Sequence, residues 1–143
     1  MNWLKKLFSR ETGELKFSDM KAVVDELNSE LLRIKSAGTV DGDHYTDYVE
    51  QVKELKRDNR LPEAIELLIK LVDATESEAR AAGEGRGVAP WYYEQLAIIY
   101  RKEKRFNDEV SILERYDAQP KAPGVGPSKL AARLSKVREL VSL

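Results

Sequence analysis

The sequence predicts an all-α fold for a chain of 143 residues. Apolar residues recur at spacings of three and four in every long segment, which is typical of helices that bury one face. No segment alternates apolar and polar residues over the length of a strand, so a sheet is not expected. Hydrophobic residues make up 42% of the chain and charged residues 34%, a balance typical of one domain with a core.

Charge and cysteine content exclude several function classes. Lys and Arg number 24 against 25 Asp and Glu, so the net charge of −1 provides no overall field that attracts nucleic acid or an acidic membrane. With no cysteine and one histidine, the chain has no disulfides, no thiolate catalysis and no Cys/His zinc site. No apolar run approaches the length of a transmembrane segment or a secretion signal, and we expect a cytoplasmic protein.

The first predicted helix covers residues 18–37, with Ser18 as its N-terminal cap and Gly38 at its end. Its apolar residues share one face: Met20, Val23, Val24, Leu27, Leu31 and Ile34. Residues 39–43 contain Gly42 and no apolar period, and they predict a loop.

Two further helices follow this loop. The second turns a set of apolar residues inward and stops near Asn59, because Pro62 disfavours helix at the residue before it. That set is Tyr45, Tyr48, Val49, Val52 and Leu55. Pro62 suits the first turn of the third helix, and the glycines in residues 83–87 end it. The third helix buries Ala64, Ile65, Leu68, Leu71, Val72 and Ala79.

The C-terminal part of the chain predicts three more helices. The fourth begins near Pro90, and the fifth is capped by Asn107. Residues 119–127 hold three prolines and two glycines and predict a surface connection. Ser128 caps the last helix, over residues 128–141. Inward-facing residues on these helices are Trp91, Tyr93, Leu96, Ala97, Tyr100, Ile112, Leu113, Tyr116, Leu130, Leu134, Val137 and Val141, while Lys129, Arg133 and Lys136 are expected to face water.

Two helix pairs in the chain match at a constant offset of 45 residues. Tyr48, Leu55, Leu61, Ala64, Leu68 and Leu71 correspond to Tyr93, Tyr100, Phe106, Glu109, Leu113 and Tyr116. This order of aromatic, small and larger apolar residues resembles the tetratricopeptide (TPR) helix–turn–helix repeat, whose usual period is 34. The offset of 45 exceeds this period by eleven residues. The family pattern places the extra residues at 79–89, and at least half of them form a loop. The chain departs from the family pattern at Lys104, where glycine is common, and at Glu109, where a small residue is usual.

The resemblance implies a single TPR-like domain over residues 16–143. Antiparallel helix pairs at about 45–78 and 90–120 would stack as a short right-handed superhelix. Because two repeats cannot cover their own ends, we expect capping helices at 18–37 and 128–141. Residues 88–102 also look like a stretch of bacterial proteins of this repeat type.

In the TPR family, the first helix of each pair lines the concave groove. Carried over to this chain, the groove residues are Lys53, Lys56 and Arg57 in one pair, and Trp91, Glu94, Arg101 and Lys102 in the other. An aromatic floor with cationic walls suits an acidic peptide or a free C-terminal carboxylate, although these residues could equally be ordinary solvated helix charges. We therefore expect a non-enzymatic scaffold for protein–protein interaction. The alternative is binding of nucleic-acid phosphate through the same basic face, with Arg105 added. On this reading Arg101→Glu is a surface substitution that changes stability little.

No other motif carries a chemical function that we would assign, and we expect no catalytic residue, cofactor or metal. His44 lies among acidic residues that fail the calcium-loop template and suit a helix N-terminus instead. The two glycine-rich stretches, residues 83–87 and 124–129, do not match the pattern of a phosphate-binding loop. Helical spacing separates Tyr93 and Tyr100, which are expected in the core, from Trp91 and Tyr92, so the second pair is free to be exposed even though Trp91 also falls among the inward-facing residues.

Residues 1–15 predict a separate N-terminal amphipathic segment. Its apolar residues are Trp3, Leu4, Leu7 and Phe8, beside Lys5 and Lys6. One such turn binds a membrane weakly by itself, so we expect it to dock on the domain or on a partner chain. Self-association of the protein is compatible with this pattern.

Overall fold

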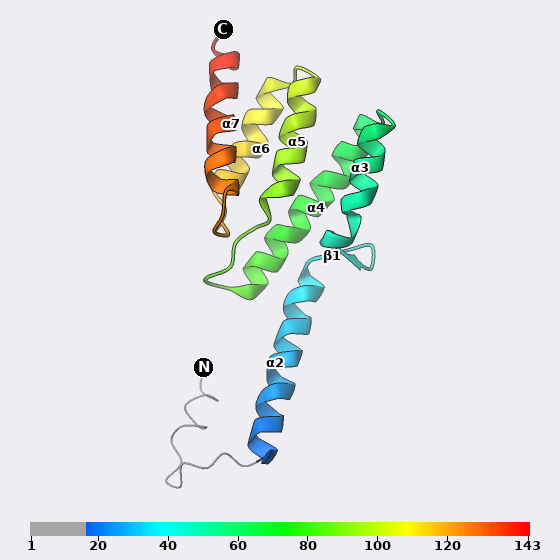
Figure 1. Cartoon of the computed structure of the whole chain (residues 1–143), viewed down its shortest axis with the longest axis vertical. Helices are drawn as coiled ribbons and strands as arrows, with labels where there is room; N and C mark the ends of the chain where they lie inside the picture. The colour runs from blue at the N-terminus through cyan, green and yellow to red at the C-terminus, as the bar shows by residue number, and fades with distance from the viewer. Residues whose placement is uncertain (1–16) are drawn as a thin grey trace.

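The computed structural model describes residues 17–143, and the predicted N-terminal segment at 1–15 lies outside this part of the chain. The all-α prediction is confirmed (Figure 1). The described elements are α2 (Phe17–Ala37), β1 (Thr39–Val40), β2 (Asp43–His44), the 3-10 helix η1 (Tyr45–Tyr48), α3 (Val49–Arg57), α4 (Leu61–Ala82), α5 (Pro90–Lys102), α6 (Phe106–Asp117) and α7 (Gly126–Val141).

Helix α2 forms where the sequence predicts it, but it does not cover the domain as a cap. It packs against α4 at its C-terminal end and then projects away from the other helices (Figure 1). Within α2 only Ile34 is buried. Its exposed large apolar side chains are Phe17, Met20, Val24, Leu27, Leu31 and Leu32. The predicted apolar face of α2 therefore exists. The expectation that the rest of the domain buries this face is wrong.

The segment predicted as a loop at 39–43 is a short β-hairpin. Strands β1 and β2 pair antiparallel, with Thr39 opposite His44 and Val40 opposite Asp43. The two turn residues, Asp41 and Gly42, both have positive φ, 51° and 92°. A two-residue Asp-Gly loop with positive φ at both positions is the geometry of a type I′ hairpin turn. The strands are only two residues long, which is why no alternating pattern shows in the sequence.

The α3–α4 and α5–α6 turns have the same backbone geometry at positions 45 residues apart. Asn59 and Lys104 have φ of 57° and 59°. The residues that follow, Arg60 and Arg105, have ψ of 62° and 66°. The N–H of each arginine donates to the carbonyl five residues earlier, at 2.8 and 2.7 Å. The offset found in the sequence is thus also present in the main chain of both turns.

The left-handed conformation at Lys104 gives a prediction about stability. A side chain other than glycine costs about 1–2 kcal/mol in this region, and glycine loses part of that gain through its freer unfolded state. We expect Lys104→Gly to raise the free energy of unfolding by about 1 kcal/mol in urea denaturation. Asn59→Gly is the matched control and should gain less, because asparagine tolerates this conformation. Equal or lower stability in the Lys104 variant would contradict the argument.

The core lies between α3, α4, α5, α6 and α7, with Val40 of β1 and Tyr45 of η1, and most of the predicted inward-facing residues are buried in it. The largest fully buried apolar side chains are Tyr93, Leu68, Leu71, Leu96, Ile99, Leu113 and Leu130. Val141, in contrast, is exposed at the end of α7.

Three predicted caps are wrong. Helix α2 already includes Phe17, before Ser18. Helix α6 begins at Phe106, before Asn107, and α7 begins at Gly126, before Ser128. Neither α6 nor α7 has a side-chain cap at the observed N-terminus. Instead, α6 starts from the repeated turn and α7 from Pro127 in its first turn, where the fixed φ of proline suits a helix.

The α4–α5 connection is held against the α6–α7 connection. The N–H of buried Val88 donates to the carbonyl of Pro120 at 2.9 Å, and Val88 forms a parallel bridge with Lys121. At Gly87, a Cβ atom would lie 2.0 Å from the amide nitrogen of Ala122. Glycine is required there because the two main chains approach too closely for a side chain.

Candidate functional site

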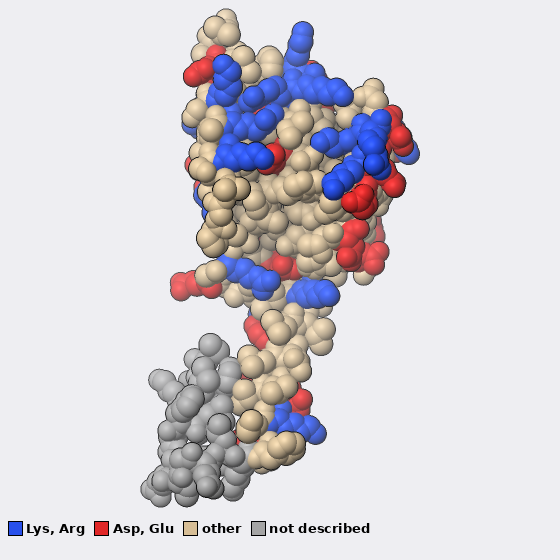
Figure 2. Space-filling view, viewed as in Figure 1, with Lys and Arg blue, Asp and Glu red and all other residues tan. Residues whose placement is uncertain are grey.

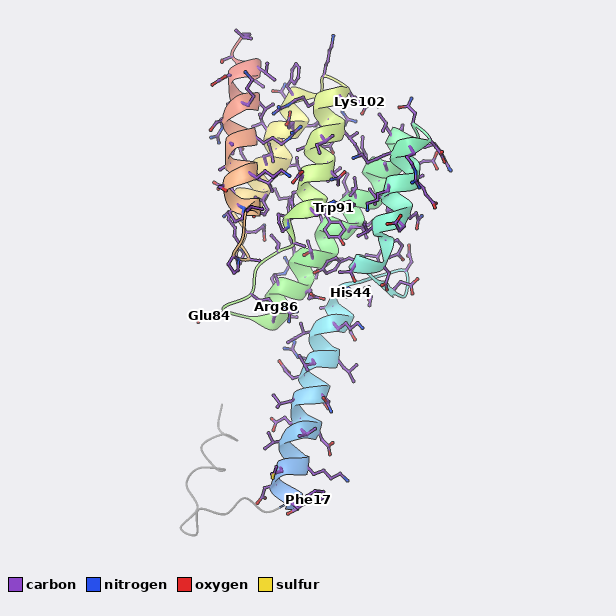
Figure 3. The ribbon with its side chains drawn as sticks, viewed as in Figure 1. Phe17, His44, Glu84, Arg86, Trp91 and Lys102 are labelled. Atoms are coloured by element: carbon purple, nitrogen blue, oxygen red, sulfur yellow. The ribbon has the colours of Figure 1, made fainter. Side chains whose placement is uncertain are left out.

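The predicted groove residues lie on α3 and α5, which are joined by a hydrogen bond between Lys56 and Gln95. Figure 2 shows Lys and Arg side chains in two groups at the upper end of this face, with mostly uncharged surface between them. One group lies over α3 and the other over α5 and α7. In Figure 3, Trp91 points from the lower part of α5 toward α3, while Lys102 lies at the upper end of α5.

Lys56 is the half-buried cation of this face. Its Nζ donates to Oε1 of Gln95, a neutral acceptor that does not balance its charge. Burial lowers the pKa of Lys56 below its ordinary value, Glu94 opposes this lowering, and the like charge of Lys102 adds to it. Glu94 therefore compensates the charge of Lys56 only in part.

Three more of the predicted cations are exposed. Arg57 and Lys102 have no ion-pair partner among residues 17–143. Lys53 lies 3.5 Å from Glu50 on the same helix, a surface contact that contributes little. These side chains are available to a ligand on the face between α3 and α5.

Glu94 is not a free carboxylate in the groove. Its Oε1 lies 2.9 Å from Nζ of Lys129 on α7, and its side chain is mostly buried. The contact joins α5 to α7 on the face that carries Lys56. Glu94 thus helps to hold α5 against α7. Its charge also acts on Lys56, whose pKa it raises.

Arg101 is part of a buried ion-pair network and not a groove wall. Its Nε donates to Oε1 of Glu109 at 2.8 Å, and its Nη2 donates to the carbonyl of Arg133 at 3.2 Å. The Nε of Arg133 lies 2.9 Å from Oε2 of Glu109, but off the line of a hydrogen bond, so this contact is an ion pair. The side chain of Glu109 is 0% exposed.

This network corrects two expectations. Arg133 is held inside the α6–α7 contact and does not simply face water. Arg101→Glu is not a surface substitution, because it would bring a second carboxylate to buried Glu109. The departure from the repeat pattern at Glu109 was the one sequence signal for this site.

The burial of the aromatic residues at the start of α5 differs from the prediction. Tyr92 is 3% exposed, not on the surface. Its OH donates to the carbonyl of Tyr45 at 3.2 Å, and burial raises the pKa of Tyr92. Trp91 is half-buried and meets the ring of Tyr92 edge-on, with centroids 5.1 Å apart. Tyr45 of η1 packs against Tyr92, with ring centroids 5.3 Å apart, and a helical period alone does not reveal this contact.

His44 forms a contact that the sequence did not indicate. Its Nε2 contacts Oε2 of Glu78 on α4, and its Nδ1 lies 2.8 Å from Oγ1 of Thr46. The OH of Tyr45 also donates to Glu78, at 3.2 Å. A cavity of about 310 Å³ at the C-terminal end of α2 is lined in part by His44, Thr46 and Glu78. The His44 side chain also caps η1 by accepting from the N–H of Thr46, a role that the sequence did not suggest for it.

A second buried carboxylate joins α4, α5 and α6. Glu76 accepts from Nε of Arg115 at 2.8 Å and from the OH of Tyr93 at 2.7 Å. Asp73 also contacts Arg115, at 2.6 Å, and these hydrogen bonds raise the pKa of Arg115. Glu76 falls on the apolar face of α4 between Val72 and Ala79, and a carboxylate at such a position is the sequence signal that was missed.

Among residues 17–143, no cluster of three or more His, Cys, Asp or Glu side chains is arranged to hold a metal ion. In the same part of the chain, no helix combines the length and apolar character that a membrane span needs. Comparisons with protein-family models, curated protein sequences and solved structures gave no match to this chain.

Proposed function

We propose that this protein is a TPR-like helical scaffold that binds an acidic segment of a partner protein on the face between α3 and α5, without catalysing a reaction. The bound segment would present Asp or Glu side chains, or a free C-terminal carboxylate, to Lys56 and the exposed cations beside it. The proposal rests on the face defined by Lys53, Lys56, Arg57, Trp91 and Lys102.

The single observation that carries this proposal is the state of Lys56. Its amine has lost part of its hydration, its hydrogen-bond partner is a neutral amide, and the nearby Glu94, which is itself paired with Lys129, does not restore its ordinary pKa. A carboxylate placed beside it would offset these effects. The face is therefore better satisfied with an anionic ligand than without one.

Trp91 supplies the apolar part of the same surface. It is half-buried and held edge-on against Tyr92, so it loses little conformational freedom when a ligand covers it. Arg57 and Lys102 lie at the C-terminal ends of α3 and α5, away from Trp91 at the start of α5, and can contact carboxylates at that end of the face. Arg57 additionally offers a planar two-pronged donor that suits a carboxylate.

Selection from random peptides of about twelve residues, a length sufficient to cross a groove, tests this proposal. We expect enrichment of Asp and Glu around an apolar residue. In the Trp3→Phe variant, Trp91 is the only tryptophan, so a bound peptide should change the fluorescence. The double variant Arg57→Glu/Lys102→Glu should weaken binding of the selected peptide by at least about tenfold, because it places like charges opposite each other.

The matched control is Lys70→Glu/Arg80→Glu, which makes the same change in net charge on α4. It should leave the affinity within about twofold, because screened distant charges contribute little. Equal affinity for both double variants would contradict the assignment of the site. Tighter binding of single-stranded DNA with a steep loss of affinity in salt would instead favour the nucleic-acid alternative.

A further inference from the structure

Helix α2 carries a regular apolar stripe that the domain does not cover. Phe17, Met20, Val24, Leu27, Leu31 and Ile34 follow one another at spacings of three, four, three, four and three. This mean spacing of about 3.5 residues is that of a coiled-coil seam rather than of a helix lying on a broad core. Of these side chains only Ile34 is buried, while the others are 42–84% exposed.

The domain occupies one end of this seam. Ile34 is buried where α2 packs against α4, and Arg33 beside it donates to the carbonyl of Ala81 at 2.8 Å. From Leu31 back to Phe17 the helix extends away from the other helices (Figure 1). The free part of the seam thus spans about two heptads on a helix that the domain anchors at one end.

We propose that α2 pairs with α2 of a second copy of this chain as an antiparallel two-stranded coiled coil. In this pairing Met20 faces Leu31 of the second copy, and Val24 faces its Leu27. The orientation follows from the position of α4. A parallel pair would place both domains at the same end of the coiled coil and set two Ile34 side chains that α4 covers against each other. An antiparallel pair places the domains at opposite ends and leaves α4 next to only the first residues of the second α2.

The charges along α2 fit the same orientation. Beyond its first turn, the N-terminal half holds Asp25 and Glu26 against Lys21, a net charge of −1. The C-terminal half holds Arg33 and Lys35 against Glu30, a net charge of +1. Antiparallel pairing sets the negative half of each helix against the positive half of the other, and it also opposes the two helix dipoles.

Sedimentation of the full chain over about 1–300 µM tests self-association by mass action. The mass should rise with concentration from 16.3 kDa toward twice that value. Leu27→Glu places a charge in the middle of the seam and should weaken association by at least about tenfold. Ser29→Glu puts the same residue on the opposite face of α2 and should associate like the wild type. Because Leu27 is outside the core, both variants should keep the helical circular dichroism of the domain.

Engineered cysteines test the orientation, since the chain has no cysteine of its own. A mixture of Met20→Cys and Leu31→Cys chains should form a mixed disulfide, because the two positions face each other. Met20→Cys alone should not cross-link, because eleven residues of helix separate the two thiols by about 16 Å.

Self-cross-linking of Met20→Cys in preference to the mixture would overturn the antiparallel arrangement. A monomer at every concentration would overturn the pairing itself. This includes the case in which the seam is covered by residues 1–16 of the same chain or binds phosphatidylglycerol vesicles as a monomer. These outcomes leave the peptide-binding proposal untouched, because its residues lie on α3 and α5.

Discussion

Arg101→Glu is expected to lower the free energy of unfolding by about 3–5 kcal/mol, the usual cost of breaking a buried ion pair by changing one partner. The substitution removes the hydrogen bond to Oε1 of Glu109 and adds a carboxylate beside a side chain with 0% exposure. Arg133 alone would then face two negative charges. Urea denaturation followed by circular dichroism measures the change.

Arg57→Glu is the control for this prediction, because it makes the same charge reversal at an exposed position on α3. We expect it to change stability by about 0.5 kcal/mol or less, as surface substitutions do. If both variants unfolded at the same urea concentration, Glu109 would not depend on Arg101. The comparison also explains why Lys102, and not Arg101, is the α5 residue to reverse when binding is tested.

Removal of α7, by ending the chain after residue 125, should have the largest effect of all. Leu130, Leu134 and Val137 are buried by 94% or more. At about 1.5–3 kcal/mol for each buried aliphatic side chain, their loss removes about 5–9 kcal/mol. That is comparable to the whole stability of a typical domain. Aggregation or a large fall in melting temperature is therefore the expected result.

Loss of α7 also uncovers α6, including the side chains of Ile112 and Tyr116, and takes Arg133 away from Glu109. Binding of a dye that reports exposed apolar surface should rise. A control chain that ends after Val141 lacks only two exposed residues and should melt like the full protein. If the chain ending at residue 125 also melted like the full protein, α7 would not seal the stack.

Helix positions in this chain could be predicted from the sequence because each helix carries an apolar face, whether or not the domain buries it. The stop before Pro62, the start at Pro90 and the buried residues of α4 and α6 all follow from local spacing and proline geometry. The same spacing says that a face is apolar, but not what covers it. For this reason the exposure of α2 and the burial of Tyr92 could not be predicted.

The candidate site was harder to predict, because its electrostatics depend on contacts between distant parts of the chain. Lys56 and Gln95 are 39 residues apart, and Arg101 and Arg133 are 32 apart. A basic residue on a helix face has the same appearance in the sequence whether it meets water or a buried carboxylate. Glu109 and Glu76, however, interrupt apolar faces, and such interruptions can be read before a structure exists.

The contact between Val88 and Pro120 also bears on the long spacing between the two helix pairs. Because this contact and the hydrogen bond from the N–H of Ala89 to Thr75 on α4 hold the start of α5 in place, residues 83–86 only connect two anchored segments. Insertions or deletions there change only the entropy of closing the loop, by about 0.6 kcal/mol for each doubling of its length. The chain can therefore accommodate a period of 45 residues without any change in how α5 packs on α6.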